Sequence, residues 1–280
     1  MKLNRKKVNI INFPIDCFSK IEVLRYLFTR LNLKASTFIT TVNSEFAYFA
    51  FTDNKVAEML KKRSLNLADG AGILWAAKFL SLNLPKNKFW QVIVGVSKFK
   101  LSLLSIIFYP KYIKNPIPER ITGSDFVWDL SKFARDNNLS IFLLGAGPTV
   151  AEQASLKLQT EVLGLKIAGT YGGTPKIKDE KNIIDLIKKT KADILLVAYD
   201  VPNEELWLER NLGKTEAKIG IGVGGTFDFL ADRRKRAPRF LQIIGLEWLF
   251  RLIIEPSRFK RQFALPKFVW KVFKYKIQSL

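Results

Sequence analysis

Short β-branched runs alternate with longer stretches of helical periodicity up to about residue 230 of the chain. This alternation constrains the fold most, because a strand–helix–strand order is typical of a parallel sheet with helices on both faces. The predicted strands are at 37–42, 64–68, 140–144, 166–169, 192–198 and 218–223. The predicted helices are at 44–62, 72–82, 124–137, 149–163, 179–189 and 203–212. We therefore expect an α/β protein with a Rossmann-like parallel sheet sandwiched by helices.

The net charge of +21 on 280 residues is unevenly distributed. Residues 233–280 hold 13 Lys and Arg against two Glu, and residues 86–114 hold six Lys and no acid. Such an excess favours a polyanionic partner, which is a nucleic acid, an anionic membrane or a phosphorylated substrate. Because both basic segments are also rich in aromatic residues, a membrane interface fits them better than a nucleic acid does.

Two segments depart from the alternating pattern. Residues 86–118 are hydrophobic and lysine-rich, and they form either an additional core helix or an amphipathic insertion that rests in the lipid interface. The most apolar run, at 101–109, is shorter than the roughly 20 residues that span a bilayer. The basic start of the chain lacks the apolar core of a signal peptide. We therefore expect an α/β domain at 1–232 and a basic helical appendage at 233–280 that lies on a membrane.

Histidine is absent from the chain, and Cys17 is its one cysteine. Ser–His and Cys–His nucleophile pairs, zinc sites of His and Cys, and an intrachain disulfide are therefore excluded. A general base would have to be Asp, Glu, Lys or Tyr. Asp69 is the candidate, since it follows a predicted strand and precedes Gly70 and Gly72, where open α/β sheets bind ligands. The alternative is that Asp69 caps the following helix.

Two glycine clusters follow other predicted strands. Gly145 and Gly147 match a dinucleotide-binding loop poorly, because Val150 stands where a third glycine is expected. A pocket for a nucleotide phosphate or a uracil beside this loop stays open. The second cluster, GVGGTFDF at 222–229, offers a Thr and an Asp to a ligand, and its alternative is a tight strand–helix turn.

Arginines are interleaved with aromatic and aliphatic residues in RAPRFLQIIGLEWLFRLIIEPSRFKR at 236–261. Guanidinium groups suit bidentate binding of a diphosphate, and the apolar neighbours suit a lipid surface. Glu247 and Arg251 are four residues apart, so a surface ion pair on a helix is the alternative role for Arg251. Pro256 makes a continuous helix past Glu255 unfavourable.

In their order, these motifs resemble those of the WecG/TagA/CpsF family of bacterial glycosyltransferases (glycosyltransferase family 26). The similarity covers nearly the whole chain: TVNSE at 41–45, DGAG at 69–72, PERITGSD at 118–125, FLLGAGP at 142–148, GVGGTFD at 222–228, RAP at 236–238 and GLEWLFRLIIEPSRFKR at 245–261. The insertion at 86–118 is longer than the family usually shows.

The resemblance implies inverting transfer of an N-acetylhexosamine-type sugar, N-acetylmannosamine or its uronic acid, from a UDP donor to a polyprenyl-diphosphate-linked sugar. This transfer would serve cell-surface polysaccharide or teichoic-acid-like synthesis at the cytoplasmic face of the membrane, peripherally and without a metal or cofactor. Asp69 would be the base. The substrate-binding residues would be Thr41, Asn43, Arg120, Gly145, Gly147, Glu204, Gly224, Gly225, Asp228, Arg251, Arg258 and Arg261.

One motif departs from the family pattern. The family's G-x-P-K-Q-E is DVPNEE at 200–205, so Glu204 replaces a glutamine and Asp200 a glycine. Two acids beside a UDP diphosphate would repel it. This keeps a non-catalytic relative that binds lipid-linked sugar or nucleotide as an alternative, beside a basic nucleic-acid-binding protein. Assembly into a homo-oligomer stays open.

Overall fold

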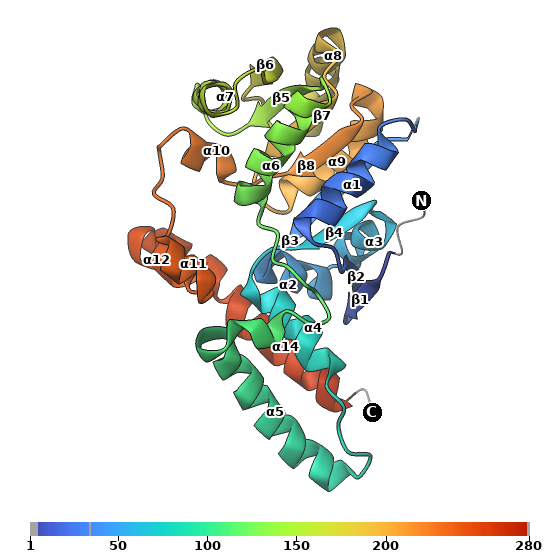
Figure 1. Cartoon of the computed structure of the whole chain (residues 1–280), viewed down its shortest axis with the longest axis vertical. Helices are drawn as coiled ribbons and strands as arrows, with labels where there is room; N and C mark the ends of the chain where they lie inside the picture. Colours follow the sequence, from blue (N-terminus) through green and yellow to red (C-terminus); the bar gives the residue numbers. More distant parts are fainter. Residues whose placement is uncertain (1–4, 34, 279–280) are drawn as a thin grey trace.

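The computed structural model describes residues 5–33 and 35–278, apart from the side chain of Arg258. Six strands form one sheet in the order β4-β3-β8-β7-β5-β6, and all neighbouring pairs are parallel (Figure 1). The strands are β3 (Thr37–Val42), β4 (Leu65–Ala68), β5 (Ser140–Gly145), β6 (Lys166–Tyr171), β7 (Ile194–Ala198) and β8 (Ile219–Gly222). The predicted α/β fold and its six strands are confirmed.

Helices cover both faces of this sheet, because side chains that alternate along the buried strands feed two separate apolar clusters. One face packs on α1 (Lys20–Arg30), α6 (Gly123–Asp136) and α7 (Val150–Glu161). The other face packs on α8 (Glu180–Thr190) and α9 (Asn203–Thr215). The short helix α10 (Thr226–Leu230) follows β8 and lies against α7.

Two features at the N-terminal side differ from the prediction. A two-stranded antiparallel hairpin, β1 (Lys7–Ile10) and β2 (Phe13–Asp16), precedes the main sheet. The predicted helix at 44–62 is two helices, α2 (Ser44–Thr52) and α3 (Asn54–Lys62). The break occurs at Asp53, whose side chain accepts a hydrogen bond of 2.8 Å from the Lys55 amide and so caps α3.

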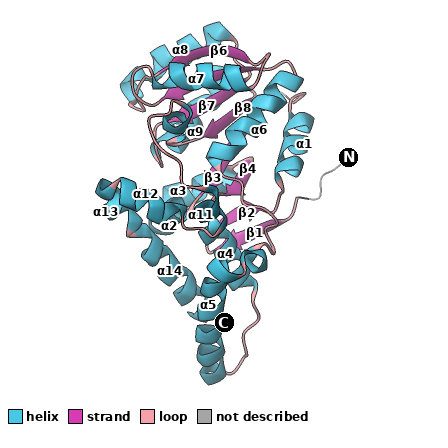
Figure 2. Cartoon of the chain, turned by 60° about the vertical axis from the view of Figure 1, so that its left-hand side comes forward, coloured by secondary structure: helices cyan, strands magenta, loops and turns pink. Residues whose placement is uncertain are grey.

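The segment at 86–118 contains α5 (Lys88–Phe108), a continuous helix that extends beyond the sheet together with α14 (Ala264–Gln278) (Figure 2). By length and composition alone, α5 is long enough to cross a bilayer, so the nine-residue apolar run underestimated its length. It is attached to the protein along one side, next to α4 (Ala71–Ser81) and α14. The Gln91 side chain donates a hydrogen bond of 3.1 Å to the Ile277 carbonyl.

The C-terminal appendage is present as α11 (Arg239–Ile243), α12 (Glu247–Ile254), α13 (Phe259–Gln262) and α14. As expected, α12 ends before Pro256, where a 3-10 turn begins. The last helix, however, is not separate from the domain. Phe268 and Val272 are fully buried in an apolar cluster with Trp75 of α4 and Phe46 of α2. One face of α14 therefore belongs to the core, and only its other face is free for the membrane contact predicted for the appendage.

Candidate functional site

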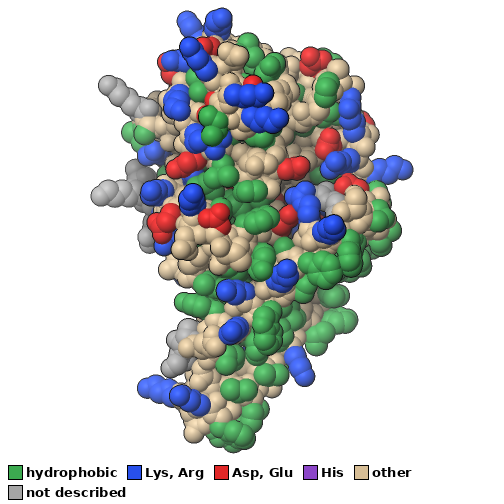
Figure 3. Space-filling model, turned by 180° about the vertical axis from the view of Figure 1, so that it is seen from behind, with side chains coloured by type: hydrophobic (Ala, Val, Ile, Leu, Met, Phe, Trp, Pro, Cys, Tyr) green, Lys and Arg blue, Asp and Glu red, His purple; other side chains and the backbone are tan. Residues whose placement is uncertain are grey.

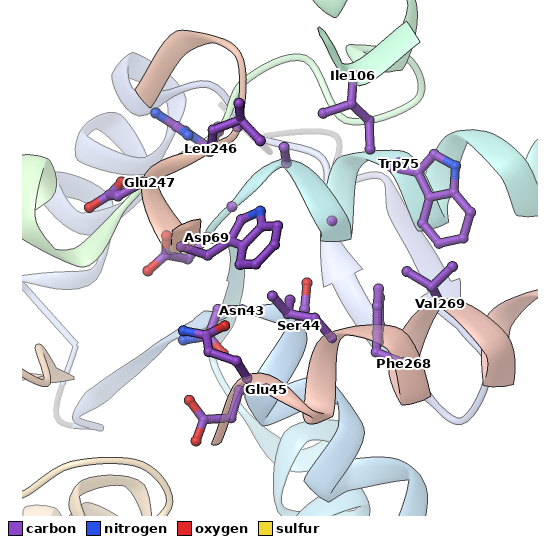
Figure 4. A pocket seen from close by; sticks show the side chains of 18 of the residues that line it. Asn43, Ser44, Glu45, Asp69, Trp75, Ile106, Leu246, Glu247, Phe268 and Val269 are labelled. Atoms are coloured by element: carbon purple, nitrogen blue, oxygen red, sulfur yellow. The ribbon is translucent and has the colours of Figure 1, made fainter. Parts of the chain in front are cut away.

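A cavity of about 530 Å³ lies at the carboxyl ends of β3 and β4, between the domain, the end of α5 and the appendage (Figure 4). Five residues predicted from the sequence line it, namely Asn43, Asp69, Arg120, Arg251 and Arg261. They come from segments far apart in the chain. The parallel sheet brings the first two together, because consecutive strands β3 and β4 are neighbours and end at the same edge.

Asp69 does not cap the helix that follows it. The N-cap of α4 is Gly70, which makes no side-chain capping bond. Gly70 has φ of +101°, a conformation that glycine adopts without strain, and this turn directs the chain away from β4 after Asp69. Asn43 follows β3 and does cap a helix, since its Oδ1 accepts a hydrogen bond of 2.9 Å from the Phe46 amide. Its amide nitrogen is the group left for a ligand.

The protein around Asp69 makes it a stronger base than an ordinary aspartate. Burial raises the pKa of its carboxyl group to about 6, and the negative charge of Glu247 acts in the same direction. Arg120, Arg251 and the backbone amide of Gly123, which donates to Asp69 Oδ2 at 3.5 Å, act against this rise in pKa. A carboxylate with this pKa is ionised at neutral pH and accepts a proton more readily than an exposed one.

Arg120 and Arg251 connect the Asp69 side of the cavity with the appendage. The Arg120 guanidinium donates a hydrogen bond of 2.8 Å to the Gln242 carbonyl of α11. Arg251 donates to Glu247 Oε1 at 2.8 Å, so the predicted ion pair four residues apart on α12 is present. This pair does not remove Arg251 from the site, because both of its members line the cavity.

Arg261 reaches the cavity from α13 and binds Glu45, the second residue of α2. Its Nε donates to Glu45 Oε1 at 2.8 Å and its Nη2 to Oε2 at 3.3 Å, which is a bidentate ion pair. A diphosphate presents oxygens to a guanidinium with similar geometry. Glu45 therefore occupies the position on Arg261 for which an anionic ligand would compete.

The other predicted residues lie outside the lining of this cavity. Thr41 is buried beneath the start of α6, where a Cβ added to Gly123 would lie 3.3 Å from its Oγ1. Arg258 has its side chain outside the described part of the structure. The glycine clusters and Glu204 are at the carboxyl ends of β5, β7 and β8, namely at Gly145, Gly147, Glu204, Gly224, Gly225 and Asp228.

The first glycine cluster is explained in part by packing. Gly145 has φ of +109°, and a Cβ there would lie 2.4 Å from the Ala198 carbonyl oxygen, so β5 and β7 require a glycine. Gly147 has no such constraint, because a Cβ there would meet only Val150 Cγ2 at 3.6 Å. Packing therefore requires a glycine at position 145 and does not require one at position 147.

The second cluster forms the tight strand–helix turn that was its alternative reading. Gly224 has φ of +51°, and the Thr226 hydroxyl donates to the Val223 carbonyl at 2.5 Å. Asp228 is paired at 3.3 Å with Arg234, which lies at the start of the appendage. These contacts give the turn a structural role.

Glu204 lies beneath this turn, only 2% exposed. Its carboxyl group accepts hydrogen bonds from the amides of Gly224 at 2.9 Å and Tyr199 at 3.3 Å. Burial and the neighbouring Glu205 raise the pKa of Glu204 well above its ordinary value. Burial therefore favours the neutral form of this carboxyl group, which repels a diphosphate less than a carboxylate does.

Several functional features of the cavity were not predicted. One wall is apolar and is formed by side chains from α4, α5, α14 and the residue that precedes α12, namely Trp75, Leu103, Ile106, Leu265, Val269 and Leu246. The spacing of 103 and 106, and of 265 and 269, is that of one helix face, and it was the sequence signal from which this wall could have been predicted.

In the described residues, no group of three or more His, Cys, Asp or Glu is placed to hold a metal ion.

A model of the glycosyl transferase WecG/TagA/CpsF family matches residues 8–91 and 104–280. The chain belongs to this family. The match leaves out 92–103, within α5.

Two similar proteins are both named "N-acetylglucosaminyldiphosphoundecaprenol N-acetyl-beta-D-mannosaminyltransferase". The one from Bacillus spizizenii is 27% identical over 82% of this chain and 90% of its own length. The one from Staphylococcus aureus (strain MRSA252) is 26% identical over 98% of this chain and 94% of its own. The predicted membership is confirmed, and the chain is a glycosyltransferase.

Proposed function

We propose that this glycosyltransferase moves an N-acetylhexosamine-type sugar from a UDP donor to a sugar carried on polyprenyl diphosphate, with inversion at the anomeric carbon. N-acetylmannosamine or its uronic acid is the proposed sugar. The names of the two relatives support a lipid-linked N-acetylglucosamine acceptor and N-acetylmannosamine as the sugar that is transferred. The cavity supports both partners, since arginines and an apolar wall border the same space.

The observation that carries the assignment of a base is the pairing of the carboxylates in the cavity. Glu45 and Glu247 are each ion-paired with an arginine. Among the described side chains, Asp69 makes no ion pair, and its pKa is raised to about 6. A carboxylate that is already engaged by a guanidinium is a poor proton acceptor, so Asp69 is the group suited to general-base chemistry.

The proposed reaction is a single displacement. The acceptor hydroxyl oxygen attacks the anomeric carbon of the donor while Asp69 accepts the hydroxyl proton. The bond between the anomeric carbon and the phosphate oxygen breaks, and UDP leaves with the bonding electrons. Arg251 and Arg261, with Arg120 nearby, stabilise the negative charge that develops on the diphosphate. Asp69 afterwards releases its proton to solvent.

We place the protein on the cytoplasmic face of the membrane as a peripheral enzyme. Large apolar side chains are exposed on α5 and the appendage, including Phe108, Phe240, Ile253 and Trp270. The basic charge is concentrated in the same segments, as an anionic lipid surface requires. The alternative of nucleic-acid binding would require a basic groove of polar character across the fold, whereas these basic segments are apolar.

The donor is identified by assaying the purified protein in detergent with a polyprenyl-diphosphate-linked N-acetylglucosamine and a panel of UDP-N-acetylhexosamines. We expect transfer from UDP-N-acetylmannosamine or UDP-N-acetylmannosaminuronic acid and from none of the gluco or galacto donors. Transfer from a different donor would overturn the proposed sugar. Binding of UDP and lipid without any transfer would instead support the non-catalytic alternative.

A further inference from the structure

The helix α5 buries the wrong kind of residue for a helix that faces water. Its buried residues are Gln91, Gly95 and Ser102, which are polar or small. Its exposed side chains include Phe89, Trp90, Val92, Leu101, Leu104 and Phe108, with exposed fractions from 48% to 79%. A surface helix of a soluble protein shows the opposite distribution, so this face fits an apolar environment.

The charges on the same part of the molecule are of one sign. The sequence has no Asp or Glu between Asp69 and Glu119, nor after Glu255. Seen from behind, the end of the molecule formed by α5 and α14 shows many apolar and several basic side chains and no acidic one among those drawn in colour (Figure 3). An apolar surface bordered by lysines is complementary to a bilayer with anionic head groups.

The position of α5 relative to the Asp69 cavity is fixed by buried contacts. Trp75 Nε1 donates a hydrogen bond of 2.9 Å to Ser102 Oγ, and both side chains are buried. The rings of Phe99 and Trp75 lie 5.9 Å apart edge to face. Because Trp75 also lines the cavity, the same side chain connects the lipid-facing helix with the site.

The last turns of α5 form part of the cavity wall. Ile106 and Ile107 line it, and a Cβ added to Gly245 before α12 would lie 3.1 Å from Ile106 Cγ2. Figure 4 shows Ile106, Trp75, Phe268 and Val269 on one side of the cavity and Glu247 on the other, with Asp69 between them. Ile107 belongs to both surfaces, since it lines the cavity and is 42% exposed. The apolar wall is therefore continuous with the exposed face of α5.

We propose that the end of α5 and the start of α14 form the binding groove for the hydrocarbon chain of the acceptor. The exposed face of α5 lies in the bilayer, so the chain passes along Leu103 and Ile107 from lipid to cavity, and the diphosphate meets the arginines. This inference rests on the proposed function for the identity of the acceptor. It adds the residues that bind the hydrocarbon chain, and one of them, Leu103, belongs to the part of α5 that the family model leaves unmatched.

The test compares two ligands that share a diphosphate and differ in chain length. Geranylgeranyl diphosphate and dimethylallyl diphosphate are titrated by calorimetry into the full-length protein in detergent. The variants are Ile107→Asn and, as the matched control, Leu156→Asn on α7, where another large side chain is 63% exposed. Both positions are exposed, and thermal melts check that each variant is folded.

We expect the wild type to bind geranylgeranyl diphosphate more tightly than dimethylallyl diphosphate. Ile107→Asn should weaken the binding of geranylgeranyl diphosphate by about fivefold or more, because this factor corresponds to the loss of contact with one or two methylene groups. Its affinity for dimethylallyl diphosphate should stay within about twofold, and Leu156→Asn should change neither affinity. An equal loss for both ligands, or no loss for either, would overturn the groove. The titration needs no transfer, so an inactive wild type with chain-dependent binding would contradict the proposed function and retain the groove.

Discussion

The Glu247 carboxylate accepts a hydrogen bond of 2.8 Å from the Arg251 guanidinium, and the two side chains act in opposite directions on the pKa of Asp69. Glu247 raises this pKa and Arg251 lowers it. Both residues belong to α12 of the appendage, whereas Asp69 follows β4 of the domain. Burial is the main cause of the raised pKa of Asp69, and the appendage adjusts this pKa in both directions.

Replacing Glu247 by Gln should shift the acid limb of the pH–rate profile to lower pH. The pKa of Asp69 is raised to about 6, so activity is present above this pH and is lost as pH falls through it. Without the Glu247 charge the Asp69 carboxylate is easier to form, and its pKa falls. The measurement is kcat/KM from pH 4.5 to 8, with Glu58→Gln on the exposed face of α3 as control. A limb that stays at about pH 6 in Glu247→Gln would contradict this coupling.

Replacing Arg261 by Ala should lower kcat/KM by about tenfold or more, since a charge-assisted hydrogen bond to diphosphate contributes roughly 1.5–3 kcal/mol. The matched variant is Glu45→Gln, which removes the ion-pair partner and keeps the guanidinium. If Arg261 binds the diphosphate, Glu45→Gln retains most of the activity. Equal losses of kcat/KM in the two variants would mean that activity depends on the ion pair between Arg261 and Glu45 and not on binding of the diphosphate by Arg261.

Asp69→Asn should stabilise the protein at neutral pH while removing its base. A carboxyl group whose folded pKa lies above its unfolded value stabilises the fold below the unfolded pKa, and this contribution is lost as pH rises through about 6. Asparagine carries no charge, so it avoids the cost of burying an ionised carboxylate at neutral pH. We expect a gain of about 1–2 kcal/mol in unfolding free energy at pH 7.5 and little gain at pH 4. Urea denaturation at both pH values measures this difference. A variant less stable than the wild type at pH 7.5 would show that Asp69 holds the site together.

Glu204→Gln should raise the melting temperature more at pH 8.5 than at pH 6. Burial raises the pKa of Glu204 and of its neighbour Glu205, the latter to about 8. The contribution of these neutral carboxyl groups to the stability of the wild type is therefore lost as pH rises through their raised pKa values. Glutamine keeps an acceptor for the Gly224 amide and carries no charge. Glu216→Gln, at an exposed ion pair, is the control. UDP-sugar binding at pH 6 should be unchanged, and a large change in it would place Glu204 in contact with the donor.

Much of the fold could be predicted because the strands of a parallel sheet are buried on both faces and read as β-branched runs between turn residues. The β1–β2 hairpin could not be predicted in this way. Its turn places Ile11 at φ of +60°, a conformation that isoleucine rarely adopts, and Pro14 lies within its second strand. The break between α2 and α3 was missed because the apolar periodicity continues across Asp53.

The site was predictable where it depends on strand ends and not where it depends on distant contacts. Asn43 and Asp69 each follow a strand, which is visible in the sequence. The ion pair of Arg261 and Glu45 joins residues 216 positions apart, and no local pattern indicates it. The burial of Phe268 was equally hidden, because a helix with aromatic and lysine residues is compatible with a lipid surface and with a core.

The most direct measurement is the turnover of Asp69→Asn with UDP-N-acetylmannosamine and a polyprenyl-diphosphate-linked N-acetylglucosamine, compared with the wild type under saturating substrates. If Asp69 is the general base, kcat falls by about 10²–10⁴-fold, while the KM for the acceptor changes little. A kcat within about tenfold of the wild type would contradict the assignment of Asp69 and the mechanism built on it.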